Sequence, residues 1–244
     1  MANKPPADRT RSTPTVQMDT SSDTEISEFL SKVAAMPSSA EPGTRGRLIF
    51  ALDATMSRQP TWDRACHLQS EMFEEAGRVG GLDIKLVYFR GFGECRSSKW
   101  FSSTGDLARV MATIDCRGGR TQIGKVLTCG INEAGKGKVH ALVYVGDCME
   151  EHIDDLCHRA GELGLLGVPV FAFQEGRDPD AERAFREIAR LTNGAFCRFD
   201  SGSARELGDL LKAVAAFASG GKKALTALEK SGGKGARLLL EQLK

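Results

Sequence analysis

The sequence lacks both a long hydrophobic run and an excess of charge of either sign, and each absence excludes a class of function. Lys and Arg number 33 against 32 Asp and Glu, so the formal net charge is +1. A general nucleic-acid binder usually carries a clear basic excess. The longest charge-free apolar stretch near the predicted core, Leu163–Phe173, contains Pro169 and is far shorter than the about 20 residues that cross a bilayer. We therefore expect neither a nucleic-acid partner nor a membrane partner.

An export signal and paired cysteines are missing as well. Residues 1–12 are polar and proline-rich with no apolar run behind them, which is unlike a secretory signal. The seven cysteines are an odd number at irregular spacing, and no two form a Cys-x-x-Cys pair. Such cysteines are typical of free thiols in a reducing compartment. These features predict a cytoplasmic protein.

The length and composition that remain fit one globular domain with two tails. The chain has 244 residues, of which 41% are hydrophobic and 27% charged, as in ordinary globular proteins. Residues 1–46 are polar and predict a flexible arm that contains a short amphipathic helix over about 24–36, which either packs on the domain or binds a partner. The domain itself is predicted over 47–220. Residues 221–244 carry six Lys or Arg and two Glu, which predicts a basic amphipathic tail that caps the domain or docks on an acidic partner.

Apolar runs and amphipathic stretches alternate along the predicted domain. Buried strands are predicted over 47–52, 82–89, 139–145, 168–173 and 195–199, and a turn at Gly91-Phe92-Gly93 adds an antiparallel strand over 94–101. Helices are predicted over 61–79, 106–114, from about Thr121, 151–165, 179–191 and 204–218. This order predicts an α/β fold: a three-layer, doubly wound, Rossmann-like and mainly parallel six-stranded sheet, with one antiparallel edge strand and helices on both faces.

Oxygen-bearing side chains follow two of the predicted strands, at the edge where ligands bind in such sheets. The run Asp53-Ala54-Thr55-Met56-Ser57 places a carboxylate and two hydroxyls on alternate residues directly after the first strand. Asp147 follows the strand over 139–145, and Thr121 ends the Gly-rich loop Gly118-Gly119-Arg120. Carboxylate and hydroxyl oxygens are ligands that suit Mg²⁺ or Mn²⁺. We therefore predict a site for one of these ions that leaves a position for water or an incoming ligand.

This pattern resembles the metal-ion-dependent adhesion site (MIDAS) of von Willebrand factor type A (VWA) domains. That site consists of an Asp-x-Ser-x-Ser loop, a Thr after a Gly-rich loop and a later Asp. The matching residues in this sequence are Asp53, Thr55, Ser57, Thr121 and Asp147. The resemblance covers about residues 47–220 and departs at two places. Thr55 stands where the family usually has Ser, and Gly146-Asp147-Cys148 stands where it usually has Thr or Ser, then Asp, then Gly.

The resemblance implies a non-enzymatic, divalent-cation-dependent protein-binding module. Thr55 and Ser57 would bind the cation through their hydroxyls, and Asp53 and Asp147 directly or through water. Thr121 would bind it in one of two states of the domain. A partner Asp or Glu would take the remaining position. The expected role is that of an adaptor in a bacterial-style cytoplasm, within a multiprotein assembly such as an AAA+ ATPase or a chaperone-like complex.

Other functions stay open or are disfavoured on the residues alone. A structural, self-associating protein with a weak or vacant metal site is one alternative. A hydrolase with Asp53 as nucleophile is another, although the second acid of an Asp-x-Asp motif is missing. Nucleotide binding is disfavoured because no Gly-x-Gly-x-x-Gly follows the first strand and no Walker motif is present.

The residues around the predicted site have simpler expected roles. Cys148 and His152 lie four residues apart, but structural zinc sites normally use paired Cys motifs, so we expect a buried thiol and a surface imidazole. Glu150 and Glu151 are expected to favour the N-terminus of the helix that follows them, through its dipole. Arg117 and Arg120 flank the Gly-rich loop and are expected to steer an acidic partner toward the cation.

Overall fold

The computed structural model describes residues 45–60, 62–63, 81–199 and 204–230, together with Glu28 and His67. Within this part of the chain, six strands form one sheet in the order β3-β2-β1-β4-β5-β6. Every neighbouring pair is parallel except β2 and β3, which are antiparallel. The strands are β1 Gly46–Asp53, β2 Leu82–Arg90, β3 Glu94–Phe101, β4 Ala141–Gly146, β5 Val170–Glu175 and β6 Ala195–Phe199. The predicted fold class is confirmed.

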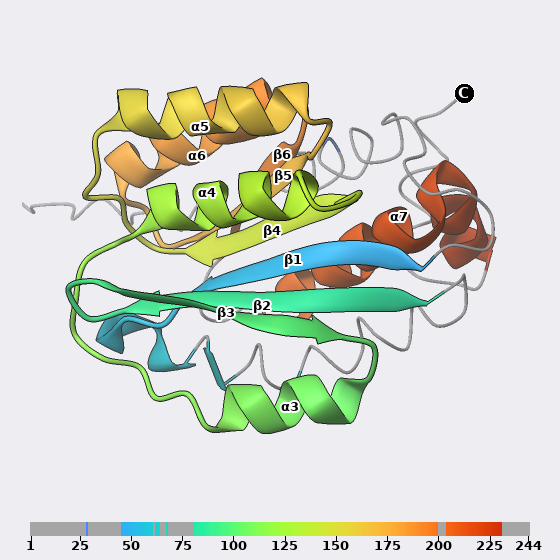
Figure 1. Ribbon diagram of the computed structural model, residues 1–244, viewed down its shortest axis with the longest axis horizontal. Helices are drawn as coiled ribbons and strands as arrows, with labels where there is room; N and C mark the ends of the chain where they lie inside the picture. Colours follow the sequence, from blue (N-terminus) through green and yellow to red (C-terminus); the bar gives the residue numbers. More distant parts are fainter. Residues whose placement is uncertain are drawn as a thin grey trace, which may run out of the picture.

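Helices cover both faces of this sheet and complete the three layers (Figure 1). They are the 3-10 helix η1 Met56–Arg58 and the α-helices α3 Thr104–Ala112, α4 Ile123–Ala134, α5 Ile153–Leu165, α6 Pro179–Leu191 and α7 Ala204–Lys230. Helices α4, α5 and α6 lie on one face, and α3 and α7 lie on the other. The predicted helices over 24–36 and 61–79 lie outside the described residues, apart from a few positions.

The apolar run of β1 is buried because each face of the sheet has its own hydrophobic core. Leu48, Phe50 and Leu52 pack in the core shared with α3 and α7. Ile49 and Ala51 pack in the core shared with α4, α5 and α6. A strand covered on both faces needs apolar side chains at successive positions. After Arg47 near its amino end, the next charged residue of the strand is the buried Asp53 at its carboxyl end.

Helix α7 differs from the prediction, which ended this helix at residue 218. It continues to Lys230 through a kink at Gly221, whose φ of 59° and ψ of −150° are accessible to glycine. Ala224, beyond the kink, is buried in the core shared with α3, and Leu228 packs partly against it. At least this part of the predicted tail therefore rests on the domain. Residues 231–244 lie outside the described residues.

The order of the strands places the ends of β1 and β4 at the centre of one edge of the sheet. From β1 the chain proceeds to β2 on one side, whereas β4 pairs with β1 on the other side. Ligands of doubly wound sheets bind outside the carboxyl ends of the strands at this switch in strand order. Asp53 and Asp147 lie there. No helix in the described ranges has the length and apolar character that a membrane span requires.

Candidate metal centre

Asp53 is the last residue of β1 and is only 2% exposed. Its Oδ1 accepts a hydrogen bond of 2.7 Å from the backbone N–H of Thr55. Its Oδ2 is buried and has no hydrogen-bond partner among the described residues. Burial raises the pKa of Asp53 to about 6, since hydrogen bonds from Thr55 offset only part of the lost hydration, and the nearby charge of Asp147 raises it further. The strand thus ends in a buried acid that lacks a counter-ion for one oxygen.

Hydroxyl groups connect the loop after β1 to the loop after β4. Thr55 Oγ1 and Ser57 Oγ lie 3.3 Å apart, and Ser57 Oγ donates a hydrogen bond of 2.8 Å to Asp147 Oδ2. Asp147 Oδ1 is also buried and without a partner in the described part of the chain. The structure therefore brings four of the five predicted ligands together. Two of their carboxylate oxygens, Asp53 Oδ2 and Asp147 Oδ1, accept no hydrogen bond from the described residues.

Thr121, the fifth predicted ligand, is buried but makes its contacts elsewhere. Its Oγ1 accepts a hydrogen bond of 3.0 Å from the backbone N–H of Glu150, and its own N–H donates one of 3.0 Å to Glu150 Oε2. Because α4 begins at Ile123 rather than at Thr121, this threonine lies in the loop before the helix. Its hydroxyl keeps a second lone pair that is available to a cation. Its role as a ligand stays a prediction.

The two glutamates after Asp147 act on a different helix from the one expected. Glu151 accepts hydrogen bonds from the backbone N–H groups of Ile123 (2.5 Å) and Gly124 (3.0 Å) in the first turn of α4, and Glu150 holds Thr121 as described above. Helix α4 has no side-chain cap from its own N-cap residue, Gln122, so its free N–H groups take a carboxylate from another loop. Periodicity around each helix cannot reveal such a non-local cap.

Arg58 is a part of the site that sequence reasoning missed. It is 2% exposed and forms an ion pair with Glu175 at the end of β5. Its charge lowers the pKa of Asp53, though less than burial raises it. Its position directly after Ser57 was the one feature of the sequence that linked Arg58 to the site, but arginine residues are mostly exposed. This guanidinium is already paired with Glu175, so the excess of carboxylate oxygen at Asp53 and Asp147 remains.

The structure shows what surrounds Gly146 and Cys148, where the sequence differs from the VWA pattern on either side of Asp147. Gly146 ends β4, and a Cβ at this position would lie 2.4 Å from Tyr144 Oη. The buried Tyr144 ring therefore requires glycine where the family usually has Thr or Ser. The Sγ atom of Cys148 lies within 4.8 Å of one carboxylate oxygen from Asp53 and one from Asp147. Sequence reasoning placed this thiol outside the site.

These residues fit a divalent cation. A buried carboxylate without a partner is costly unless it is protonated, paired with a cation or bound to a metal. Here Asp53 and Asp147 each have one buried oxygen without a hydrogen-bond partner among the described residues, and the buried arginine described beside them is paired with Glu175. Oxygen atoms of this kind are ligands for hard divalent ions. Binding of an ion by Asp53, Thr55, Ser57, Thr121 and Asp147 stays a prediction.

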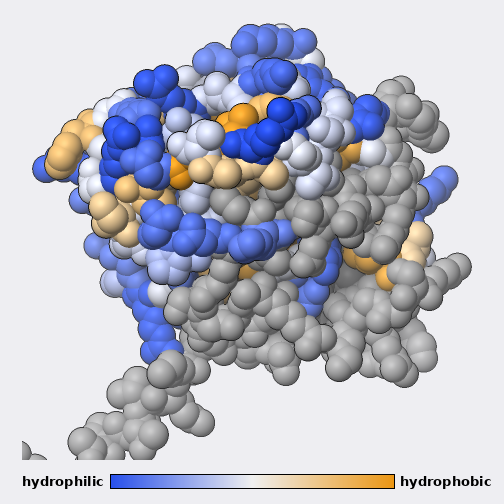
Figure 2. All heavy atoms as spheres, turned by 90° about the horizontal axis from the view of Figure 1, so that it is seen from below, coloured by the Kyte–Doolittle hydropathy of each residue, from blue (hydrophilic) through white to orange (hydrophobic). Residues whose placement is uncertain are grey.

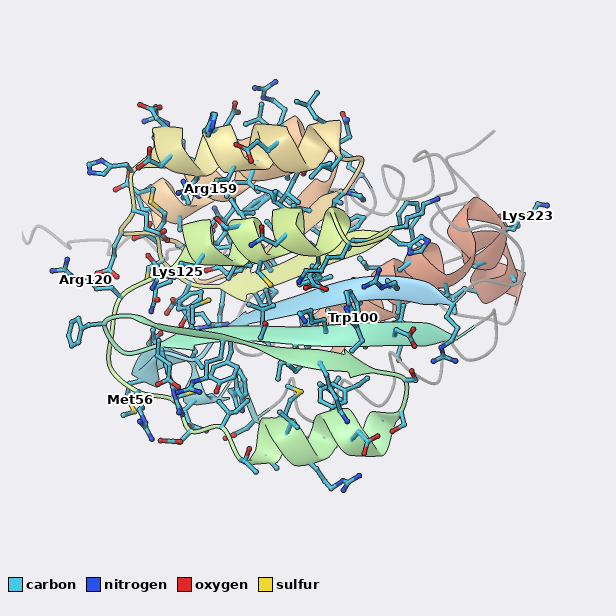
Figure 3. The ribbon with its side chains drawn as sticks, viewed as in Figure 1. Met56, Trp100, Arg120, Lys125, Arg159 and Lys223 are labelled. Carbon is cyan, nitrogen blue, oxygen red and sulfur yellow. The ribbon has the colours of Figure 1, made fainter. Side chains whose placement is uncertain are left out.

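The surface around the site combines exposed apolar side chains with an exposed arginine. Met56, inside the site loop, is 62% exposed, and Phe92, at the turn between β2 and β3, is 85% exposed. The backbone N–H of Arg120 donates to Gly91 O in this turn, and its exposed guanidinium makes no ion pair with the described residues. Figure 3 shows Met56 and Arg120 at the end of the molecule where β1 and β4 finish. Apolar spheres protrude among hydrophilic ones at this end in Figure 2.

Solved structures share this fold at low sequence identity. A von Willebrand factor type A protein from Catenulispora acidiphila matches with a TM-score of 0.58 and 13% identity, over 72% of this chain and 43% of its own. The SpRpn10 VWA domain matches with 0.54 and 14%, over 69% and 94%. Proximal thread matrix protein 1 from the mussel byssus, with a zinc-occupied MIDAS motif, matches with 0.53 and 16%, over 72% and 47%. The sequence matches no protein-family model. No curated protein matches it either.

Proposed function

We propose that this chain, which has the fold of von Willebrand factor type A domains, is a divalent-cation-dependent protein-binding module. The observation that carries the proposal is the pair of buried carboxylate oxygens, Asp53 Oδ2 and Asp147 Oδ1, that lack partners in the described part of the chain at the switch in strand order. Two carboxylates from separate loops, joined through hydroxyls, are an arrangement that a hard cation stabilises. The sequence favours Mg²⁺ or Mn²⁺.

The residues divide the task of holding such an ion. Asp53 and Asp147 supply charge, and Thr55 and Ser57 supply neutral oxygens between them. Thr121 is held close by Glu150, which ties its loop to the segment after Asp147. A bound cation, only partly neutralised by this set, would offer a coordination position to a carboxylate of a partner protein. We propose binding rather than hydrolysis because the residue two positions after Asp53 is Thr55 and not a second acid.

The surroundings of the site support a protein as the ligand. Met56 and Phe92 expose large apolar side chains on the loops around the site. Aromatic residues and methionine are enriched at the centres of protein interfaces. Arg120 supplies an exposed positive charge, without an ion-pair partner among the described residues, that would accelerate the approach of an acidic partner. We propose that the partner presents an Asp or Glu beside an apolar side chain. Its place in a cytoplasmic multiprotein assembly, with an AAA+ ATPase or a chaperone-like complex, is part of this proposal.

The proposal is tested by affinity capture from a lysate of the source cells with Mg²⁺ or with EDTA. Wild type should retain a partner with Mg²⁺ and release it with EDTA, and Asp147→Ala should retain none. Phe92→Ser should weaken capture of the same partner by about tenfold, since a truncated interface anchor often costs more than 1 kcal/mol. Asp209→Ala, which removes an exposed acid on α7, is the matched control and should behave as wild type.

The alternative functions give different results in the same experiment. A partner that wild type, Asp147→Ala and EDTA-treated protein retain equally would refute metal-dependent binding. Light scattering identifies the self-associating alternative, because the oligomer would then persist in EDTA and in Asp147→Ala. A phosphoenzyme or acyl-enzyme trapped at Asp53 would support the hydrolase alternative.

A further inference from the structure

Among the described residues, Cys148 is the one thiol that forms a cluster with the carboxylates of the site. One ligand atom from each of Asp53, Asp147 and Cys148 lies within 4.8 Å of the other two. Cys148 directly follows Asp147 in the loop after β4, so both side chains leave the same short segment. His152, four residues after Cys148, is not among the residues of this cluster. The Cys148–His152 spacing therefore does not form a metal site with it.

A second observation points to a cation at this cluster. Asp53 is 2% exposed, and its Oδ2 has no hydrogen-bond partner among the described residues. The same is true of Asp147 Oδ1, which is also buried. The cluster is therefore more than a group of surface acids. It combines a thiol with two acids, each of which has one buried oxygen without a hydrogen-bond partner in the described ranges.

We propose that Cys148 Sγ is a ligand of this site and that the site prefers a borderline first-row ion such as Zn²⁺ to Mg²⁺. The inference rests on the metal site of the proposed function and specifies its cation. Mg²⁺ takes oxygen ligands, whereas thiolate sulfur favours Zn²⁺ and its neighbours in the first row. Coordination requires the thiolate, so the thiol proton leaves to solvent when the metal–sulfur bond forms.

The spacing of the cluster is compatible with a common ion. Typical Zn–S and Zn–O distances are about 2.3 and 2.1 Å, so sulfur and oxygen ligands at a tetrahedral angle lie about 3.6 Å apart. The ligand atoms of Asp53, Asp147 and Cys148 lie within 4.8 Å of one another. A movement of the half-buried loop after β4 by about 1 Å would bring them to the tetrahedral spacing, and the Asp53 end is fixed by its bond from Thr55.

Cobalt titration of the metal-free full chain tests the proposal, because Co²⁺ replaces Zn²⁺ and a cobalt–thiolate bond gives a charge-transfer absorption band in the near ultraviolet. Wild type should show this band. Cys148→Ser should lack it, and the Zn²⁺ affinity of Cys148→Ser, measured against a chromophoric chelator, should fall by at least about tenfold, since loss of even an outer-shell partner costs that much. Its Mg²⁺ affinity should be unchanged. Cys157→Ser, in the middle of α5, is the matched control and should behave as wild type.

A third variant, Asp147→Asn, guards against cobalt bound by other thiols. It keeps Cys148 but removes a carboxylate, so the band should be lost or strongly weakened. Circular dichroism should show that each variant is folded. A band that persists in Cys148→Ser, or equal Zn²⁺ affinities of wild type and Cys148→Ser, would overturn the proposal. Mg²⁺-dependent partner capture without any cobalt band would overturn it as well and leave the proposed function standing. A Cys148-dependent band without partner capture would support this inference and count against the proposed function.

Discussion

Buried acids at the two ends of the sheet have opposite surroundings. Near the amino ends of β1 and β2, Glu133 on α4 accepts hydrogen bonds from Trp100 Nε1 (2.9 Å) and Lys136 Nζ (2.8 Å), and Lys85 Nζ lies 3.7 Å away. Burial alone would raise the pKa of Glu133, but the hydrogen bonds from Lys136 and Trp100 outweigh it, so its pKa is lowered. At the carboxyl ends, burial prevails and the pKa of Asp53 rises to about 6.

The difference between the two ends separates an acid whose hydrogen bonds are satisfied from an acid with an unpartnered oxygen. Glu133 is 6% exposed and Asp53 is 2% exposed, so the extent of burial does not distinguish them. What distinguishes them is the number of donors: Glu133 has donors from the turn after its own helix and from β3, whereas Asp53 has one backbone N–H and lies beside a second carboxylate. An acid whose pKa is raised in a cluster of this kind is a candidate for a functional site.

The largest effect on stability is expected from Arg58, which is the only buried arginine described near Asp53. Arg58→Met removes a buried charge that pairs with Glu175 and lowers the pKa of Asp53. We expect the unfolding free energy to fall by about 3–5 kcal/mol, because removing one member of a buried ion pair is strongly destabilising. Urea denaturation at pH 7 measures this. Lys136→Met, at the exposed partner of Glu133, is the control and should change stability much less.

A second prediction concerns the pH dependence of the metal-free chain. The folded state holds the Asp53 proton up to a pH of about 6, whereas an ordinary Asp releases it near 3.8. Between these values the folded state binds more protons, so the unfolding free energy falls as the pH rises. The loss contributed by this buried group is about 3 kcal/mol above pH 6.

Asp53→Asn should therefore stabilise the protein in EDTA at pH 7 while it abolishes metal binding. Urea denaturation between pH 4 and about 7, with EDTA present, compares the slopes of wild type and Asp53→Asn. A less stable Asp53→Asn protein at pH 7 would contradict the view that the empty site is strained by its own charge. A divalent cation at a hundredfold excess over its Kd should raise the unfolding free energy of the wild type by about 2.7 kcal/mol relative to wild type in EDTA.

The smallest of these effects is expected at the other end of the sheet, and its sign is opposite to that of Asp53→Asn. Glu133→Gln should lower the unfolding free energy at pH 7 by about 1–3 kcal/mol, because Lys136, Trp100 and Lys85 lose a charged acceptor at a buried position. The lowered pKa of Glu133 means that its contribution is present above the pKa of an unfolded Glu and is lost as the pH falls through its own lower pKa. A metal titration should show unchanged affinity in Glu133→Gln. Opposite signs for Asp53→Asn and Glu133→Gln are the sharpest test of the comparison.

Much of the site could be predicted from local sequence because its first loop is local. Asp53, Thr55 and Ser57 alternate directly after a buried strand, and a chain leaving a strand keeps such side chains near one another. Asp147 could be added because strand order fixes where parallel strands end. The cap of α4 by Glu151 and the ion pair of Arg58 could not be predicted, since each joins segments far apart in sequence through contacts that follow no period.

The sequence by itself determined the α/β architecture, because alternating apolar runs and amphipathic stretches have one way to bury their faces. It also determined which strand ends carry oxygen-bearing side chains. Only the tertiary structure decided which polar groups are satisfied: that Thr121 is tied to Glu150, that Arg58 is taken by Glu175, and that Cys148 lies with the carboxylates. Satisfaction of a buried polar group depends on donors brought from other segments, and those distances exist only in the folded chain.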